Sequence, residues 1–268
     1  MEFLKPTSRL SSLIVILLLI LISSSSLAAE PLRALLVTGG CCHDYEAQKK
    51  IITEGISARA NVVWTIAHEG TNRDHTVSIY TNADWAKGFD VVVHNECFGS
   101  ITNAELIGRI VSAHTNGVPA VMLHCSAHSY REATTDEWRK LLGVSSFRHG
   151  AQHAFEVVNF KPDHPVMKGF PNQWQNFPDE LYQIRKMWPD AVMLGKAVSP
   201  TEYEQPCIWV NTYGKSRVFG TTLGHRNETM ASEVYLNLIT RGLLWTCDKL
   251  GEDGKPKRGY EPTATKSH

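Results

Sequence analysis

The sequence of 268 residues lacks a net charge, because 27 basic side chains balance 27 acidic ones. Without a surplus of positive charge there is no electrostatic reason to expect a nucleic acid as partner. Charged residues make up only 20% of the chain and hydrophobic residues 43%. This composition is typical of a globular protein and excludes long disordered segments, collagen and coiled coil.

Cysteine is scarce and widely spaced. The six cysteines, none of them in a C-x-x-C motif, are Cys41, Cys42, Cys97, Cys125, Cys207 and Cys247. A structural zinc knuckle is therefore not expected, and a chain long enough to build its own core needs no disulfide scaffold. We do not expect the adjacent Cys41 and Cys42 to pair with each other.

The sequence also lacks an apolar run long enough to span a membrane comfortably, which takes about 20 residues. The apolar stretch 10–22, broken only by two serines, follows the basic Lys5 and Arg9 and leads to the small residue Ala28. This order predicts a secretory signal peptide over residues 1–28, with an uncleaved N-terminal anchor as the alternative. We expect an exported bacterial protein, periplasmic or secreted, without a stable membrane span after signal cleavage.

Apolar strands alternate with helices between residues 29 and 250. The expected strands are 33–38, 61–67, 89–93, 118–123 and 191–198, with a hairpin of 207–212 and 216–223, and the longer helices are 44–60, 102–114 and 231–248. Such an alternation predicts one α/β domain, a three-layer sandwich with a mostly parallel sheet covered on both faces. The polar C-terminal tail 251–268 is expected to fray.

Histidine, by contrast, is abundant, with 12 in the chain, and it binds metals and moves protons near neutral pH. Three of the predicted strands run into a histidine: His43, His94 and His124. In an open α/β sheet, ligands bind beyond the carboxyl ends of the strands. We therefore expect these three side chains to converge on one polar site, together with Glu96 and His128 from the same strand ends.

The strand that begins at Pro119 leads into a sharp turn comparable to a nucleophile elbow. Counting along it places His124 at the elbow and Cys125 one residue later, where its side chain would point to the opposite side. Here the sequence resembles the class I glutamine amidotransferase-like superfamily. With a histidine at the elbow, it resembles the ThuA-like (trehalose utilisation) branch of that superfamily. The segments that carry the resemblance are 37–43, 123–126, 179–182 and 213–225, and it covers about Leu32 to Cys247.

The resemblance implies a flavodoxin-like fold with amidotransferase-like additions. It also implies a role in sugar metabolism, especially of trehalose-type disaccharides and their keto forms. His225 falls where the superfamily keeps its catalytic histidine.

Residues 179–182 place two carboxylates and a phenol within four residues. One interpretation is a solvated turn after Pro178. In the other, Glu180 or Asp179 folds over the histidines as an acid/base group or metal ligand, and Tyr182 contacts a sugar hydroxyl or forms part of the wall.

The leading hypothesis is an exported hydrolase, isomerase or lyase acting on a small-molecule carbohydrate. His124, His43, His225 and Glu180 are the candidate catalytic residues, and the candidate substrate contacts are Asp179, Tyr182, His94, Glu96 and His128. Imidazoles of His43, His124 and His225 with a carboxylate suit zinc or another first-row divalent ion.

Two alternatives remain open. One is a non-catalytic sugar-binding protein on the same fold. The other is a true amidotransferase with Cys125 as nucleophile, against which the elbow count argues. The sequence is compatible with a homo-oligomer but sets no oligomeric state.

Overall fold

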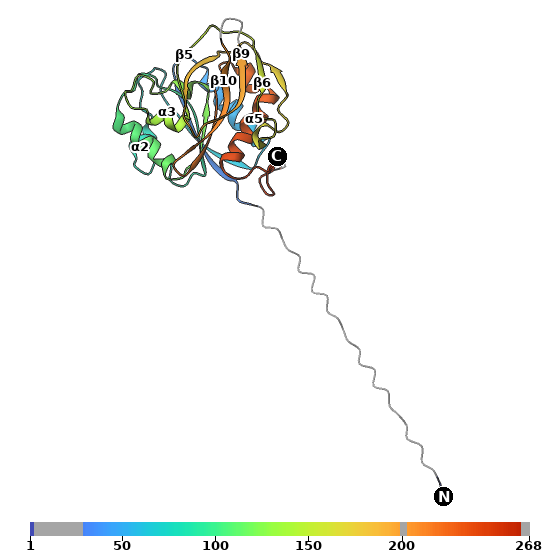
Figure 1. Ribbon diagram of the computed structural model, residues 1–268. Coiled ribbons are helices and arrows are strands. Elements are labelled where there is room, and N and C mark those ends of the chain that lie inside the picture. Colours follow the sequence, from blue (N-terminus) through green and yellow to red (C-terminus); the bar gives the residue numbers. More distant parts are fainter. Residues whose placement is uncertain (3–28, 199–202, 264–268) are drawn as a thin grey trace.

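A nine-stranded sheet runs through the protein, and helices cover both of its faces (Figure 1). The computed structural model describes residues 1–2, 29–198 and 203–263. The predicted signal peptide thus lies, but for its first two residues, outside the described residues.

Half of the large sheet is parallel. In spatial order its parallel strands are β2 (Val62–His68), β1 (Leu32–Gly40), β3 (Val91–Cys97), β4 (Ala120–Leu123) and β11 (Ser216–Thr221). This is the strand order of a flavodoxin-like sheet. The predicted α/β sandwich with a mostly parallel central sheet is therefore confirmed.

Antiparallel strands extend the sheet beyond β11. They are β10 (Gln205–Tyr213), β9 (Val192–Val198), β6 (Glu156–Asn159) and β7 (Gln173–Gln175). The predicted hairpin is formed by β10 and β11. A separate two-stranded sheet pairs β5 (Val144–His149) with β8 (Tyr182–Met187). The four antiparallel strands and this small sheet are formed by the second half of the chain.

Two pairs of helices form the outer layers. Helices α1 (Tyr45–Ser57) and α5 (Glu233–Thr246) pack on one face, and α2 (Ala104–Thr115) and α3 (Glu137–Leu142) on the other. Successive side chains of β1 point to opposite faces, so Leu36 joins the first core and Val37 the second. Shorter helical turns are η1 (Ser78–Thr81), η2 (His124–His128), η3 (Pro165–Met167) and α4 (Asn227–Ala231).

Two larger differences from the expected organisation stand out. Strand β3 continues through Cys97 instead of ending at residue 93, so His94 and Glu96 lie within the sheet. The C-terminal tail is held as far as it is described, because Asn61 N–H donates to the Tyr260 carbonyl at 3.0 Å and Lys257 N–H to that of Lys249 at 2.8 Å. The expectation that it frays is thus wrong for residues 251–263, and residues 264–268 lie outside the described part.

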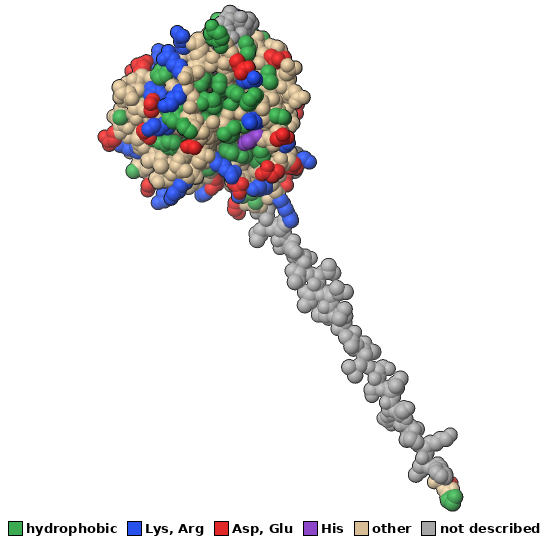
Figure 2. Space-filling view, in the orientation of Figure 1, with side chains coloured by type: hydrophobic (Ala, Val, Ile, Leu, Met, Phe, Trp, Pro, Cys, Tyr) green, Lys and Arg blue, Asp and Glu red, His purple; other side chains and the backbone are tan. Residues whose placement is uncertain are grey.

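The surface agrees with the balanced composition. Figure 2 shows side chains of both charge signs across one face of the molecule. Within the described ranges, no helix is both long and apolar enough to cross a membrane.

Candidate functional site

Three histidines converge at the carboxyl ends of the parallel strands. His43 follows β1, His124 follows β4 and His225 follows β11. The ring centroid of His43 lies 4.9 Å from that of His124 and 4.8 Å from that of His225, and the latter two are 5.5 Å apart. One ring nitrogen from each lies within 4.8 Å of the others. The structure thus joins these three predicted residues in one cluster.

His124 occupies the elbow between β4 and η2. Its backbone φ is 41°, a left-handed conformation that costs a residue with a side chain on the order of 1–3 kcal/mol. The ring Nδ1 lies 2.6 Å from the Thr222 carbonyl oxygen, so Nδ1 must carry the proton and donate it. Its Nε2 therefore presents a lone pair, which accepts a hydrogen bond from the Tyr182 hydroxyl at 3.3 Å.

A buried carboxylate clamps two site loops together. Asp179 is fully buried, and its oxygens accept hydrogen bonds from the backbone N–H groups of Glu180 at 2.8 Å, Gly224 at 2.9 Å and His225 at 2.9 Å. These bonds hold the loop that carries Glu180 against the loop that carries His225. Asp179 is therefore a positioning residue, whereas the sequence had placed it among the substrate contacts.

The Glu180 carboxylate faces three imidazoles. Its Oε2 lies 3.6 Å from Nε2 of His124, 3.3 Å from Nε2 of His149 and 3.1 Å from Nδ1 of His225. Burial raises the pKa of Glu180, but the neighbouring His124 and His225 outweigh burial and hold this pKa well below its ordinary value. Glu180 is thus an anion at neutral pH, surrounded by imidazoles.

Hydrogen bonds elsewhere fix the tautomers of two of these rings. His149 Nδ1 lies 2.8 Å from the Gly150 carbonyl oxygen, so it donates there as His124 Nδ1 does to Thr222. In their neutral forms both rings then turn an Nε2 lone pair toward the Glu180 carboxylate. Such an arrangement is repulsive unless a proton or a metal cation lies between the groups.

The tautomer of His225 depends on Gln152. The Gln152 carbonyl oxygen accepts hydrogen bonds from Arg226 at 2.6 and 3.0 Å, which leaves its amide N–H to donate to His225 Nε2 at 2.8 Å. In this orientation neutral His225 carries its proton on Nδ1, which lies 3.1 Å from Glu180 Oε2 but makes no hydrogen bond to any described residue. To offer the Nδ1 lone pair to a metal, His225 must move its proton to Nε2 and Gln152 must turn its oxygen toward it.

His43 completes the cluster as a neutral base. Burial, followed by the neighbouring His124 and His225, lowers the pKa of His43 to about 3. Its Nδ1 is buried and has no hydrogen-bond partner among the described residues. A neutral imidazole with an unpartnered nitrogen can accept a proton or bind a cation.

Stacked rings form one wall of the site. Tyr182 is fully buried and packs face to face on His128, with ring centroids 4.0 Å apart, and on His149 at 5.5 Å. His128 also hydrogen bonds to the Ser146 hydroxyl at 3.0 Å, and burial is the main cause that lowers its pKa to about 2. Both predicted contact residues, Tyr182 and His128, therefore lie in the wall.

The cluster opens into two joined hollows. A deep pocket of about 120 Å³ is lined by His43, His225, Glu180 and Tyr182 and also by Arg73, Arg131 and the cysteines Cys41, Cys42, Cys97 and Cys125. An outer hollow of about 530 Å³ shares Cys42, His43 and His225 with it. A larger hollow of about 1140 Å³ lies at the opposite edge of the sheet, and the described residues that line it include no histidine. The histidine cluster and the two hollows beside it therefore lie at the carboxyl edge of the sheet.

Two predicted contacts are not part of the site. His94 and Glu96 are fully buried on the face covered by α2 and α3, where His94 Nδ1 lies 2.8 Å from Glu96 Oε1 and His94 Nε2 lies 3.1 Å from His114 Nε2. The physical reason is the length of β3, whose alternating side chains carry both residues into the core. Their prediction as substrate contacts is therefore wrong.

Four of the six cysteines are paired, which the sequence did not predict, and Cys207 and Cys247 are free. Disulfides join Cys41 to Cys42 and Cys97 to Cys125. The expectation against the first pair is wrong, because the turn after β1, with a positive φ of 85° at Cys42, brings the neighbouring side chains together. Cys125 is thus no free thiol nucleophile in this structure.

Several site residues were missed or given a minor place. His149 was not among the candidate residues, and Gln152, Arg73 and Arg131 were not singled out. They reach the site through the pairing of β5 with β8 and through loops that fold back over the strand ends. No local sequence pattern marks such tertiary contacts.

Comparisons with known proteins agree with this architecture. The model of the ThuA family, described as trehalose utilisation, matches residues 33–246. No curated protein matches the sequence. A crystal structure of a protein described as ThuA-like from Parabacteroides merdae has a TM-score of 0.65 at 19% identity, covering 85% of this chain and 97% of that one.

Two further structures show the same fold. A protein described as ThuA-like from Bacteroides uniformis has a TM-score of 0.65 at 16% identity, covering 88% of this chain and 98% of that one. A protein described as a GMP synthase subunit, from Thermoplasma acidophilum, has a TM-score of 0.52 at 13% identity, covering 82% and 96%. The amidotransferase-like architecture is thereby confirmed, and the chain belongs to the ThuA family, which is described as acting in trehalose utilisation.

Proposed function

We propose that the protein is an exported enzyme that acts on a sugar or keto-sugar of the trehalose-utilisation class, with a divalent metal held by His43, His124, Glu180 and His225. The observation that carries the proposal is the Glu180 carboxylate, which the imidazole lone pairs of His124 and His149 face at 3.6 and 3.3 Å. A cation between them converts this repulsion into ligation.

The donor set suits a first-row divalent ion. Glu180 Oε2 and the unpartnered Nδ1 of His43 are available as they stand, and His124 Nε2 becomes available when the Tyr182 hydroxyl turns away from it. Two imidazoles with a carboxylate are a common catalytic zinc set. His225 joins as a third imidazole once Gln152 has turned. The Nδ1–H of His124 donates to a backbone carbonyl, as ligating histidines almost always do. When bound, the ion would polarise a carbonyl or hydroxyl of the sugar.

The remaining groups serve the substrate. Burial, followed by the Glu180 charge, raises the pKa of Tyr182 well above its ordinary value, so its hydroxyl stays protonated and can donate a hydrogen bond to a sugar oxygen. His149 is about one-third exposed and 3.3 Å from Glu180, which places it to take or give a proton at the pocket wall. Arg131 supports negative charge that develops in the pocket.

The size of the hollows favours one end of a disaccharide. The deep pocket of about 120 Å³ accommodates only the reacting part of a sugar ring. The outer hollow of about 530 Å³ gives room for the rest of the molecule. The alternative of an amidotransferase is not supported, because Cys125 is bonded to Cys97.

Export rests on the basic, apolar and small-residue pattern of residues 1–28. Expression in a bacterium and mass analysis of the product test it. A secreted or periplasmic chain that begins near Ala29 is the expected result, and a cytoplasmic chain that keeps Met1 would contradict it.

Turnover of a panel of disaccharides and their 3-keto derivatives tests the catalytic proposal. We expect activity that a chelator removes and a divalent ion restores. His124→Ala should lower kcat/KM by at least about a hundredfold, whereas Asn227→Ala, at the rim of the outer hollow, should keep kcat. Binding of a sugar without turnover would instead establish the sugar-binding alternative, and turnover unchanged in His124→Ala would refute the site.

A further inference from the structure

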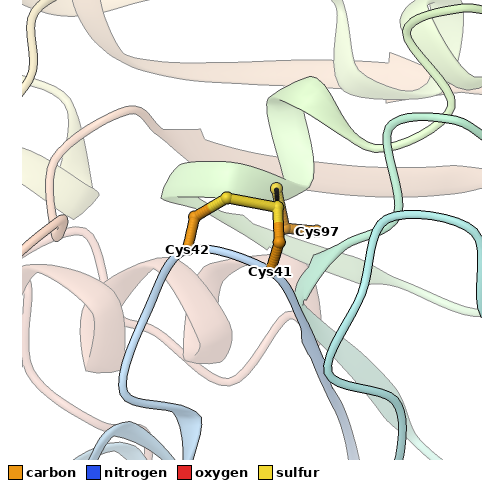
Figure 3. A group of neighbouring side chains, drawn as sticks. All are labelled: Cys41, Cys42 and Cys97. Carbon is orange, nitrogen blue, oxygen red and sulfur yellow. Dashed lines mark hydrogen bonds between the residues drawn. A yellow bond between two sulfur atoms is a disulfide. The ribbon is translucent and has the colours of Figure 1, made fainter.

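Four cysteines meet at one side of the deep pocket. Cys41 and Cys42 follow β1, Cys97 ends β3 and Cys125 lies in η2. The Sγ atoms of Cys41 and Cys97, which belong to different disulfides, are 4.0 Å apart, and those of Cys41, Cys42 and Cys97 all lie within 4.8 Å of one another (Figure 3). We call these four residues the sulfur cluster.

The backbone, rather than the disulfides, brings the sulfur cluster together. Gly40 pairs with Cys97 in the parallel ladder of β1 and β3. Its φ is +104°, and a side chain at Gly40 would collide with the Cys97 carbonyl oxygen. This close approach sets Cys41 beside Cys97 whether or not the thiols are oxidised.

The spacing of the sulfur cluster suits a metal ion. A tetrahedral zinc ion with Zn–S bonds of about 2.3 Å keeps its sulfur ligands about 3.8 Å apart. The Cys41–Cys97 distance of 4.0 Å is already close to this value. Cys125 is not among the sulfurs within 4.8 Å of one another, but its Sγ is bonded to that of Cys97 and so lies next to the group. Once the disulfides are reduced, side-chain rotation can part the two bonded pairs to the ligand spacing.

The charge of the surroundings is also suitable. Four thiolates and one divalent ion carry a net charge of −2. Arg73 and Arg131 line the same pocket as the four cysteines, and their positive charge offsets part of that negative charge. Thiolate ligands are soft and select zinc over magnesium or calcium.

We propose that the sulfur cluster is a second metal site, which binds a zinc-type divalent ion through Cys41, Cys42, Cys97 and Cys125 when the protein is reduced. Two molecules of a small dithiol act, one on each protein disulfide. Each dithiol gives two electrons to its protein disulfide and becomes a cyclic disulfide. Four cysteine thiolates form, they bind the ion, and four protons are released. In the reverse direction two molecules of hydrogen peroxide accept four electrons from the thiolates, take up four protons and become water. Both disulfides re-form and the ion is expelled.

Cobalt(II) is the probe that reports sulfur ligation, because thiolate-bound cobalt shows intense near-ultraviolet charge-transfer absorption. We expect dithiol-reduced protein, after anaerobic removal of the dithiol, to bind one cobalt ion with this absorption; an ion in the imidazole site adds no sulfur absorption. Oxidised protein should lack it. A reduced wild-type protein without this absorption would overturn the proposal.

Variants locate the ligands. Cys42→Ser and Cys97→Ser should each lose the absorption, and its retention in both would overturn the assignment. Cys247→Ser is the matched control, because Cys247 is a free cysteine and burial raises the pKa of its thiol to about 12. It should bind cobalt as the wild type does, and loss of the absorption there would count against the cluster.

Two further measurements distinguish the two proposed metal sites and test the sulfur cluster without a cysteine variant. Glu180→Gln removes a ligand of the proposed imidazole site but should keep the sulfur absorption, so failure of one site is distinguishable from failure of the other. In zinc-loaded wild-type protein, peroxide should release one equivalent of zinc to a colorimetric chelator. Absence of release would contradict the proposal without any variant that needs to fold.

Discussion

The Asp179 carboxylate holds the loops of Glu180 and His225 together, and its replacement by asparagine measures how much this clamp contributes. The asparagine side chain would keep one carbonyl oxygen, which can still accept from two of the three N–H groups. Its amide group would face the third N–H, that of Gly224, donor against donor. One charge-assisted hydrogen bond is worth about 1.5–3 kcal/mol, and its partner in this fully buried place would be left unpaired.

The expected loss of unfolding free energy for Asp179→Asn is therefore about 2–3 kcal/mol. In a domain of this size it corresponds to a fall in Tm of about 4–12 °C, measured by calorimetry. Because the variant also loosens Glu180 and His225, affinity for zinc in the non-reduced protein should fall by about 10- to 100-fold.

Asp163→Asn is the matched control. Asp163 is fully exposed and pairs only loosely with Lys168, at 3.4 Å, so its replacement should change stability by less than about 0.5 kcal/mol. Equal Tm and equal zinc affinity in Asp179→Asn and wild-type protein would refute the view that Asp179 positions the site.

Two further predictions concern other parts of the structure. Gln152→Glu gives His225 Nε2 a hydrogen-bond acceptor and so favours the tautomer with a free Nδ1. Zinc affinity in the non-reduced protein, measured by calorimetric titration, should therefore rise about tenfold. An unchanged or weaker affinity would count against ligation by His225. His114 is fully buried, and burial with the neighbouring His94 lowers its pKa to about 3. In the unfolded chain His114 takes up a proton near pH 6.5, whereas in the folded chain it stays neutral down to about pH 3. The free energy of unfolding therefore has its full value above about pH 6.5 and falls as the pH is lowered toward 3, by up to about 1.4 kcal/mol per pH unit. His114→Gln should remove this part of the slope in urea unfolding at several pH values, and an unchanged slope would contradict the assignment.

Local pattern was sufficient for the strands and for part of the site. The apolar runs that lead to His43 and His124 predict both the parallel sheet and the convergence of these residues at its carboxyl edge. The same reasoning failed for His94 and Glu96, because β3 continues to Cys97, past the apolar run that ends at residue 93. A strand that continues past its apolar residues alternates its polar side chains into the core, and the sequence does not show where it ends.

The rest of the site arises from tertiary contacts. His149 and Gln152 reach Glu180 and His225 through the β5–β8 pairing and the loop that follows β5, neither of which has a strong local signal. The pairing of Cys41 with Cys42 depends on a turn in which Cys42 has a positive φ, which follows from the packing of Gly39 and Gly40 against neighbouring strands. Sequence spacing alone does not predict such close approaches.

The central claim is that His43, His124, His225 and Glu180 hold one divalent ion, and the metal content of the protein tests it most directly. The non-reduced protein, in which the four cysteines of the sulfur cluster are closed as disulfides, is equilibrated with zinc, freed of excess zinc and assayed by elemental analysis. The account predicts one zinc per wild-type chain and none in the double variant His124→Ala, Glu180→Gln. A wild-type chain without zinc, or a double variant with the same content, would contradict it.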